Sequence, residues 1–111
     1  MARKDNPGVQ KYTVQESQNL GFGQAGSAYS DGTTMADMPG GVVVVAITML
    51  TDTKFAALTP ENSNYLEVGS TGYNGEGDTL TSSDIFPKGI TIYGKWTEVD
   101  VNTGSIVAYF G

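Results

Sequence analysis

The chain has 111 residues, of which 39% are hydrophobic and 15 are glycine, and it contains no cysteine and no histidine. This length predicts a single domain with a modest core, and the two missing residue types exclude disulfides, thiolate chemistry and histidine-based acid–base catalysis. The net charge of −6 divides into +2 over residues 1–11 (three bases, one acid) and −8 over the rest (three bases, eleven acids); such an acidic body disfavours nucleic acid as a partner.

The abundance of glycine, serine, threonine and asparagine is typical of short strands joined by turns. We therefore predict an all-β fold, a small antiparallel β-sandwich or barrel-like domain with long Gly-rich loops, over residues 9–111. Residues 1–8 are expected to form an extended arm, because Pro7 and Gly8 resist helix. Its Arg3 and Lys4 are candidate contacts with an acidic neighbour, and an ordinary solvated terminus is the alternative. Neither a secretory signal nor a membrane span is expected.

The first half of the chain predicts one strand followed by a loop. Val9–Glu16 alternates imperfectly and is expected to be an edge-like strand. Residues 17–39 form a polar, Gly-rich stretch with isolated large apolar side chains, which predicts a loop pinned onto a neighbouring surface. Either this loop folds across its own sheet or it reaches another subunit. The candidate partner contacts in it are Leu20, Phe22, Tyr29, Met35 and Met38.

The most hydrophobic run, Val42–Leu50, follows a pair of glycines and predicts a central strand buried on both faces. Residues 53–58 alternate weakly, with Phe55 expected to point inward. Thr59–Glu61 is expected to form either a short helical turn or a simple turn. Residues 62–84 read as a loop with a short strand at Tyr65–Val68, and residues 87–89 read as a turn.

The last 25 residues are organised as a predicted β-hairpin. Ile90, Ile92, Gly94 and Trp96 share one face of a strand, and the apolar parity flips beyond Thr97, which predicts a β-bulge near Trp96–Glu98. A turn is expected at Asn102–Gly104. The returning strand, Ser105–Phe110, is apolar on both faces, so a second layer from this chain or another one is expected to cover the outer face.

Two motifs resemble ligand-binding loops. Gly21–Gly26 matches G-x-G-x-x-G, but no buried strand precedes it and no helix follows, so we do not predict nucleotide binding. Asn74–Asp78 offers oxygen ligands at alternate positions, but it lacks the glycine and the final carboxylate of an EF-hand. A flexible acidic loop is the simpler interpretation, with an irregular calcium site as the alternative. We predict no cofactor and no metal.

Two further groups of residues could carry chemistry. Glu98 and Asp100 point from one face of a strand, about 6.8 Å apart, but glycoside hydrolysis would need a substrate cleft and a buried carboxyl group. We therefore predict no catalytic residue and no enzyme activity. Trp96, with Tyr93 and Tyr109, could form an aromatic platform for a sugar or a partner, and a core position for Trp96 is the alternative.

The terminal segments carry a resemblance to a known family. Residues 89–97 (GITIYGKWT) and residues 104–109 (GSIVAY), with the final Gly111, resemble the C-terminal ending of small virion structural proteins of tailed phages, especially marine and cyanobacterial ones. Those endings look like "TIYGRWT" followed by a Gly-containing turn and "VIAY.G". Residues 55–59 and 26–33 are similar to the same group. Lys95 stands where the family pattern has arginine.

The resemblance implies a capsid-associated accessory protein that decorates or cements the virion head. The implied partners are the major capsid protein and copies of the chain itself, in a homo-oligomer on the capsid surface, after synthesis in the host cytoplasm. Attachment to a tail or fibre, or a small carbohydrate-binding β module, is the alternative. Trp96 joins the residues named above as a candidate partner contact.

Overall fold

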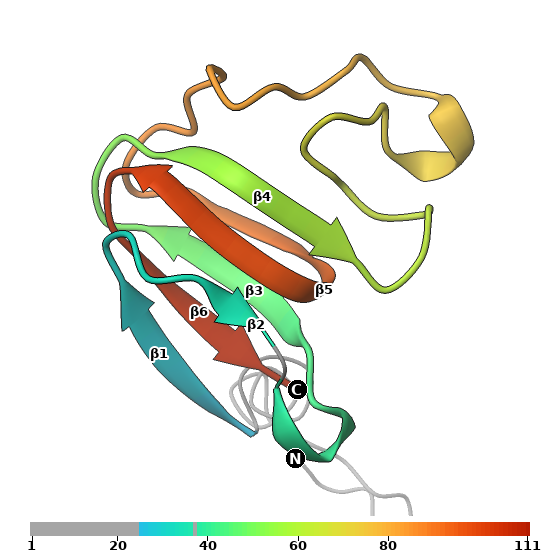
Figure 1. The fold of residues 1–111 in the computed structure, drawn as a ribbon. Helices are drawn as coiled ribbons and strands as arrows, with labels where there is room; N and C mark the ends of the chain where they lie inside the picture. The colour runs from blue at the N-terminus through green and yellow to red at the C-terminus, as the bar shows by residue number, and fades with distance from the viewer. Residues whose placement is uncertain (1–24, 37) are drawn as a thin grey trace, which may run out of the picture.

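The computed structural model describes residues 25–36 and 38–111. These residues form one antiparallel sheet of six strands that curls into a half-barrel (Figure 1), and no α-helix occurs among them. The all-β prediction is therefore confirmed. The predicted arm at residues 1–8 and the predicted strand Val9–Glu16 lie outside the described residues. The elements are β1 (Gly26–Ser30), β2 (Met35–Ala36), η1 (Pro39–Gly41), β3 (Val44–Met49), β4 (Lys54–Pro60), η2 (Tyr73–Gly75), β5 (Thr91–Thr103) and β6 (Ile106–Phe110).

Strand β3 occupies the centre of the sheet. It pairs with β5 along one edge and with β6 along the other, and Val44 and Ile47 are fully buried. Gly40 and Gly41 have φ values of 69° and 73°, so they supply the left-handed turn from which the strand emerges. The predicted central strand is confirmed, but it begins two residues later and ends one residue earlier than Val42–Leu50.

Strand β5 turns back on itself and belongs to both halves of the curled sheet (Figure 1). Its first half pairs with β3 up to Trp96, and its second half pairs with β4 from Trp96 to Thr103. Opposite β4, Thr59 pairs with Glu98 and Pro60 with Trp96, which leaves Thr97 as the extra residue. The predicted bulge is thereby confirmed. It allows Trp96, Val99 and Val101 all to be buried despite the change of parity.

The predicted terminal hairpin is wrong. The chain does reverse after Thr103, where Gly104 has a φ of 104°, but β5 and β6 do not pair with each other. Both pair with β3, which lies between them. Because β5 bends at its bulge, its last residues return to the C-terminal end of β3. There the Leu50 amide donates to the Ser105 carbonyl at 2.9 Å. The chain therefore re-enters the sheet on the other side of β3.

The described part of the predicted loop at residues 17–39 contains two strands. β1 pairs with β6, and β2 pairs with β5 at Glu98 and Val99, so this part folds across its own sheet. Its glycine content and its lack of β-branched residues in β1 hid the strands, since glycine is depleted in β structure and β-branched residues are enriched there. In the segment between β4 and β5, which is described throughout, the strand predicted at Tyr65–Val68 is absent. Val68 makes only an isolated bridge to Leu80. β4 continues to Pro60, so residue 60 ends a strand and starts no helical turn.

The core lies between the two halves of the curled sheet, and the long segment 61–90 closes one side of it. Trp96 is completely buried, and its Nε1 donates a hydrogen bond of 2.7 Å to the Leu66 carbonyl. Phe55 points inward as predicted and meets Phe86 edge to face, with ring centroids 5.2 Å apart. Among the described residues, the core cluster of buried hydrophobic side chains consists of Val44, Ile47, Met49, Phe55, Leu58, Trp96, Val99, Val101, Ile106 and Ala108.

Candidate interaction surfaces

The outer face of the sheet carries two rows of aligned side chains across β1, β6, β3 and β5. Directly paired residues in antiparallel strands point to the same face, so the register identifies each row. One row is Tyr29, Val107, Thr48 and Thr91, and the next is Ser27, Tyr109, Ala46 and Tyr93. A hydrogen bond of 2.9 Å between the hydroxyls of Thr48 and Thr91 confirms that these two share a face. We call these eight residues the tyrosine face.

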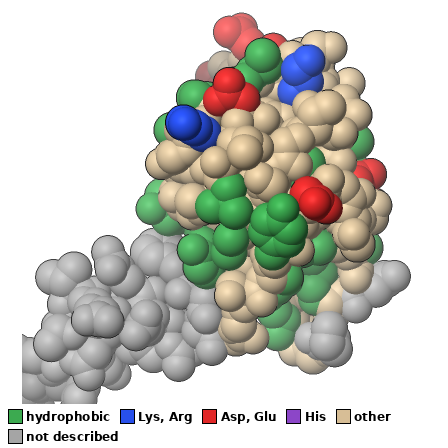
Figure 2. Space-filling model, turned by 90° about the vertical axis from the view of Figure 1, so that its left-hand side faces the viewer, with side chains coloured by type: hydrophobic (Ala, Val, Ile, Leu, Met, Phe, Trp, Pro, Cys, Tyr) green, Lys and Arg blue, Asp and Glu red, His purple; other side chains and the backbone are tan. Residues whose placement is uncertain are grey.

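The tyrosine face is partly open to solvent: three of its eight residues are exposed and four are half-buried. Tyr29 and Tyr93 are each 61% exposed, and Val107 and Tyr109 are half-buried. Ala46 is 2% exposed because it is small and sits between the two larger tyrosines of its row. None of the eight side chains is charged. Figure 2 shows hydrophobic side chains gathered near the middle of one side of the molecule.

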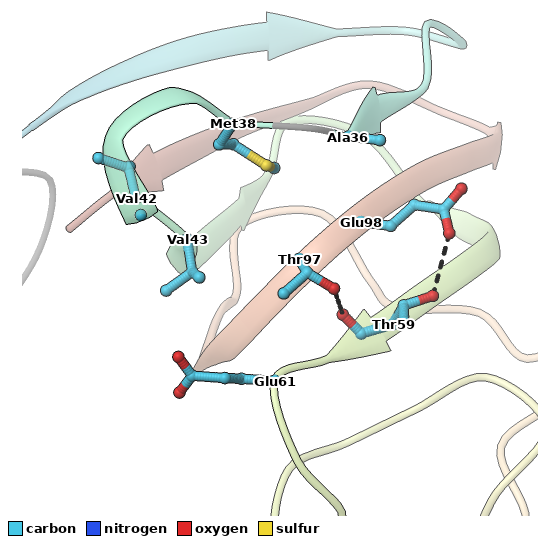
Figure 3. Close-up of a pocket in the computed structure, with 9 residues that line it drawn as sticks. Ala36, Met38, Val42, Val43, Thr59, Glu61, Thr97 and Glu98 are labelled. Carbon is cyan, nitrogen blue, oxygen red and sulfur yellow. Dashed lines mark hydrogen bonds between the residues drawn. The ribbon is translucent and has the colours of Figure 1, made fainter.

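A groove lies where η1 and the residues just before β3 approach the end of β4 and the bulge in the middle of β5 (Figure 3). Its volume is about 640 Å³. Met38, Val42 and Val43 form an apolar wall, and Glu61 and Glu98 face the same space. Met38 and Val42 also line a smaller hollow of about 300 Å³ beside Phe110. The groove thus combines an apolar wall with two carboxylates, and none of the described residues that line it is basic.

Hydrogen bonds between β4 and β5 fix the polar wall of the groove. The Thr59 hydroxyl donates to Glu98 Oε1 at 3.1 Å, and the Thr97 hydroxyl donates to the Thr59 carbonyl at 3.2 Å. These contacts follow from the bulge at Thr97, which aligns Thr59 with Glu98. Glu98 is therefore a partly buried, hydrogen-bonded side chain of the sheet, whereas Glu61 is exposed.

The predicted contact residues are distributed over different parts of the molecule. Tyr29 is exposed on the tyrosine face. Met35 and Met38 are partly buried against the core, and Met38 also lines the groove. The remaining loop and arm candidates, Arg3, Lys4, Leu20 and Phe22, lie outside the described residues.

The prediction of Trp96 as a partner contact is wrong. Its exposed fraction is 0%, and its indole N–H is already bonded to a backbone carbonyl. The bulge turns this side chain into the core, so it cannot form an aromatic platform with Tyr93, which is 61% exposed on the outer face. The core alternative stated for Trp96 is the one that the structure supports.

The acidic residues do not assemble into a metal site in the described part of the chain. No group of three or more carboxylates gathers there, and Glu76 and Asp78 of the calcium-like loop are exposed. In residues 25–36 and 38–111 there is also no helix long and apolar enough to cross a membrane.

Comparison with known proteins gives no relative. No family model matches the chain, and no match is found among curated proteins or solved structures.

Sequence reasoning missed the tyrosine face as a unit. Its signal was present in β6, whose outward residues Val107 and Tyr109 predicted a face that needs a second layer. The residues that the other three strands contribute to this face could not be assigned, because they depend on β1 and on the position of β3 between β5 and β6. Strand order across a sheet is set by long-range pairing, which local periodicity does not report.

Proposed function

We propose that this protein is a non-enzymatic virion structural protein of a tailed phage. In this proposal it decorates or cements the head, bound to the major capsid protein and to copies of itself at the capsid surface. The observation that carries the proposal is that two tyrosines of the tyrosine face come from the segments that carry the family resemblance. Tyr93 and Tyr109 belong to the two terminal segments that resemble virion structural proteins, and they lie on the exposed side of β5 and β6.

The chemistry of this face suits a protein partner. Tyrosine offers a large, rigid contact area at low cost in side-chain entropy, and its hydroxyl tolerates water at the rim of an interface. The side chains stand on paired strands of the sheet, so little ordering is needed on binding. Because the face is uncharged, binding through it should change little with salt. Any contribution from Arg3 and Lys4 should weaken as salt screens it.

The proposal contains no catalytic step. The two carboxylates considered for hydrolysis, Glu98 and Asp100, are partly buried on β5, and Glu98 accepts a hydrogen bond from Thr59. With no histidine or cysteine in the chain, the usual general bases and nucleophiles are missing. A sugar-binding module built on Trp96 is not supported, because that ring is inside the core.

The decisive experiment images purified protein mixed with empty phage heads. Symmetric, stoichiometric density on the head surface is expected for the native chain. In Tyr93→Ser, occupancy should fall with a rise in the dissociation constant of about tenfold or more, since burying a large side chain contributes roughly 1.5–3 kcal/mol. Tyr73→Ser is the matched control, because Tyr73 is 62% exposed but lies in η2, away from this face.

The outcomes separate the candidate roles. Density only at the tail would replace the head assignment by the tail or fibre alternative. Equal loss in both tyrosine variants would show that the face is not the contact. Absence of binding to any part of the virion would overturn the proposal.

A further inference from the structure

We propose that two copies of this chain join edge to edge through β1, so that the curled sheet continues from one copy into the other. The inference rests on the proposed function for its biological setting, because it names the surface by which copies of the subunit meet. The pairing itself is a property of the purified protein.

The edge strands β1 and β4 differ in how they are covered. At the β4 edge, residues of the long segment 61–90 take up backbone groups. Thr53 and Phe86 exchange two hydrogen bonds of 2.8 Å, and the Val68 amide donates to the Leu58 carbonyl at 3.4 Å. β1, by contrast, pairs with β6 and with no other described strand. An edge strand leaves every second pair of backbone groups pointing outward, ready for another strand.

The sequence of β1 has none of the features that usually protect an edge. Its residues, GSAYS, include no proline and no charge, whereas β4 begins with Lys54 and ends with Pro60. Lysine and proline at an edge discourage pairing between molecules, and their absence favours it. β2, at the other end of the strand order, has only two residues, so β1 offers the longer open edge among the described strands. Pairing of β1 with β1 uses up this edge after two copies, as in an isologous dimer.

The geometry of β1 is compatible with pairing to itself. In an antiparallel pair centred on Ala28, Ser27 of each copy faces Tyr29 of the other. Both side chains belong to the tyrosine face and are exposed, so the two faces would merge into one surface. Tyr29 would cover part of its neighbour, which adds aromatic contact to the backbone hydrogen bonds.

Charge decides how this dimer responds to salt. Each copy carries a net charge of −6, so two copies repel each other, while the paired strands themselves contain no charge. Added salt screens this repulsion. The dimer should therefore tighten as salt rises, which is the opposite of a contact made by the basic arm.

The test measures self-association of the full chain by sedimentation equilibrium, together with hydrogen exchange at several protein concentrations. We expect a monomer–dimer equilibrium in which amides of Gly26–Ser30 become more protected as concentration rises, while those of β4 do not. In S27K/Y29K, four added positive charges meet across the two-fold axis, and the dissociation constant should rise about tenfold or more.

A control with the same charge change separates edge repulsion from net charge. N64K/S83K adds two lysines at exposed positions of the segment 61–90, and this variant should dimerise as well as or better than the native chain because its net charge is smaller. A native chain that stays monomeric, a dimer unaffected by S27K/Y29K, or open-ended polymers would each overturn the inference. Head binding by a strictly monomeric chain would leave the proposed function intact, and a β1 dimer that binds no virion would do the reverse.

Discussion

At the scale of single residues, Gly94 and Trp96 form a pair that defines the bend of β5. Both lie on the inner face of the strand, two positions apart, and the Trp96 ring lies over Gly94. A Cβ added at Gly94 would come within 2.7 Å of Trp96 Cζ2 and 2.8 Å of Cη2. The need for glycine here is steric, because the backbone of Gly94 is not in the left-handed region. A large buried ring therefore requires the smallest residue beside it.

We predict that Gly94→Ala lowers the free energy of unfolding by about 1–3 kcal/mol, the usual cost of overpacking a filled core. Trp96 is the single tryptophan of the chain, so urea denaturation followed by far-ultraviolet circular dichroism measures this loss in both backgrounds. Phenylalanine lacks the two ring atoms that the new methyl group would meet, so Gly94→Ala should cost less in a Trp96→Phe background. Equal costs in the two backgrounds would contradict the proposed contact and would place the effect of Gly94 in the backbone.

At the scale of the elements, the strands differ in how firmly their backbones are held. β3 has a paired strand on both edges and several fully buried side chains. β1 has one partner among the described strands, and most of its residues are exposed. Central strands open only with global unfolding, whereas edge strands open locally at lower free energy. The sheet should therefore have a graded stability from its centre to the β1 edge.

We predict that the amides of Ala46, Ile47 and Thr48 show the highest protection in native-state hydrogen exchange. At protein concentrations too low for self-association, the amides of β1 should exchange through local opening with a smaller free energy. Two-dimensional NMR in deuterated buffer measures both. Protection of β1 equal to that of β3 in a monomer would be inconsistent with an open edge.

At the scale of the whole molecule, the charge distribution limits stability. The chain has twelve acidic and six basic residues, and it has no histidine whose titration would change the net charge near neutral pH. Like charges on a small body repel one another more in the folded than in the unfolded chain, because folding brings them closer. Salt reduces this repulsion over a distance of about 10 Å at 0.1 M.

We expect the free energy of unfolding at pH 7 to increase when sodium chloride is raised from about 10 mM to about 150 mM, over which the Debye length falls from about 30 Å to about 8 Å. The increase should be modest, because most of the charged side chains in residues 25–36 and 38–111 are exposed and well solvated. Urea denaturation at the two salt concentrations gives the difference. A decrease with salt would mean that attractive ion pairs outweigh the net repulsion.

The all-β class, the central strand and the bulge of β5 could all be predicted from local sequence patterns. Each depends on local chemistry: the β-branched run at residues 42–45, the glycines before it, and the change of apolar parity after Thr97. Such signals survive because a side chain's orientation along a strand follows from backbone geometry alone. The same local reasoning also placed Phe55 in the core.

The order of the strands, and with it the candidate surfaces, could not be predicted from local patterns and became clear in the folded chain. The sequence suggested a hairpin of β5 and β6, but β3 pairs with both and separates them. The bend of β5 buries Trp96 and aligns Tyr93 with Tyr109 across Ala46. These outcomes depend on which distant strands pair and which face each one buries. That choice is made by packing of the whole core, since several pairings satisfy the same local pattern.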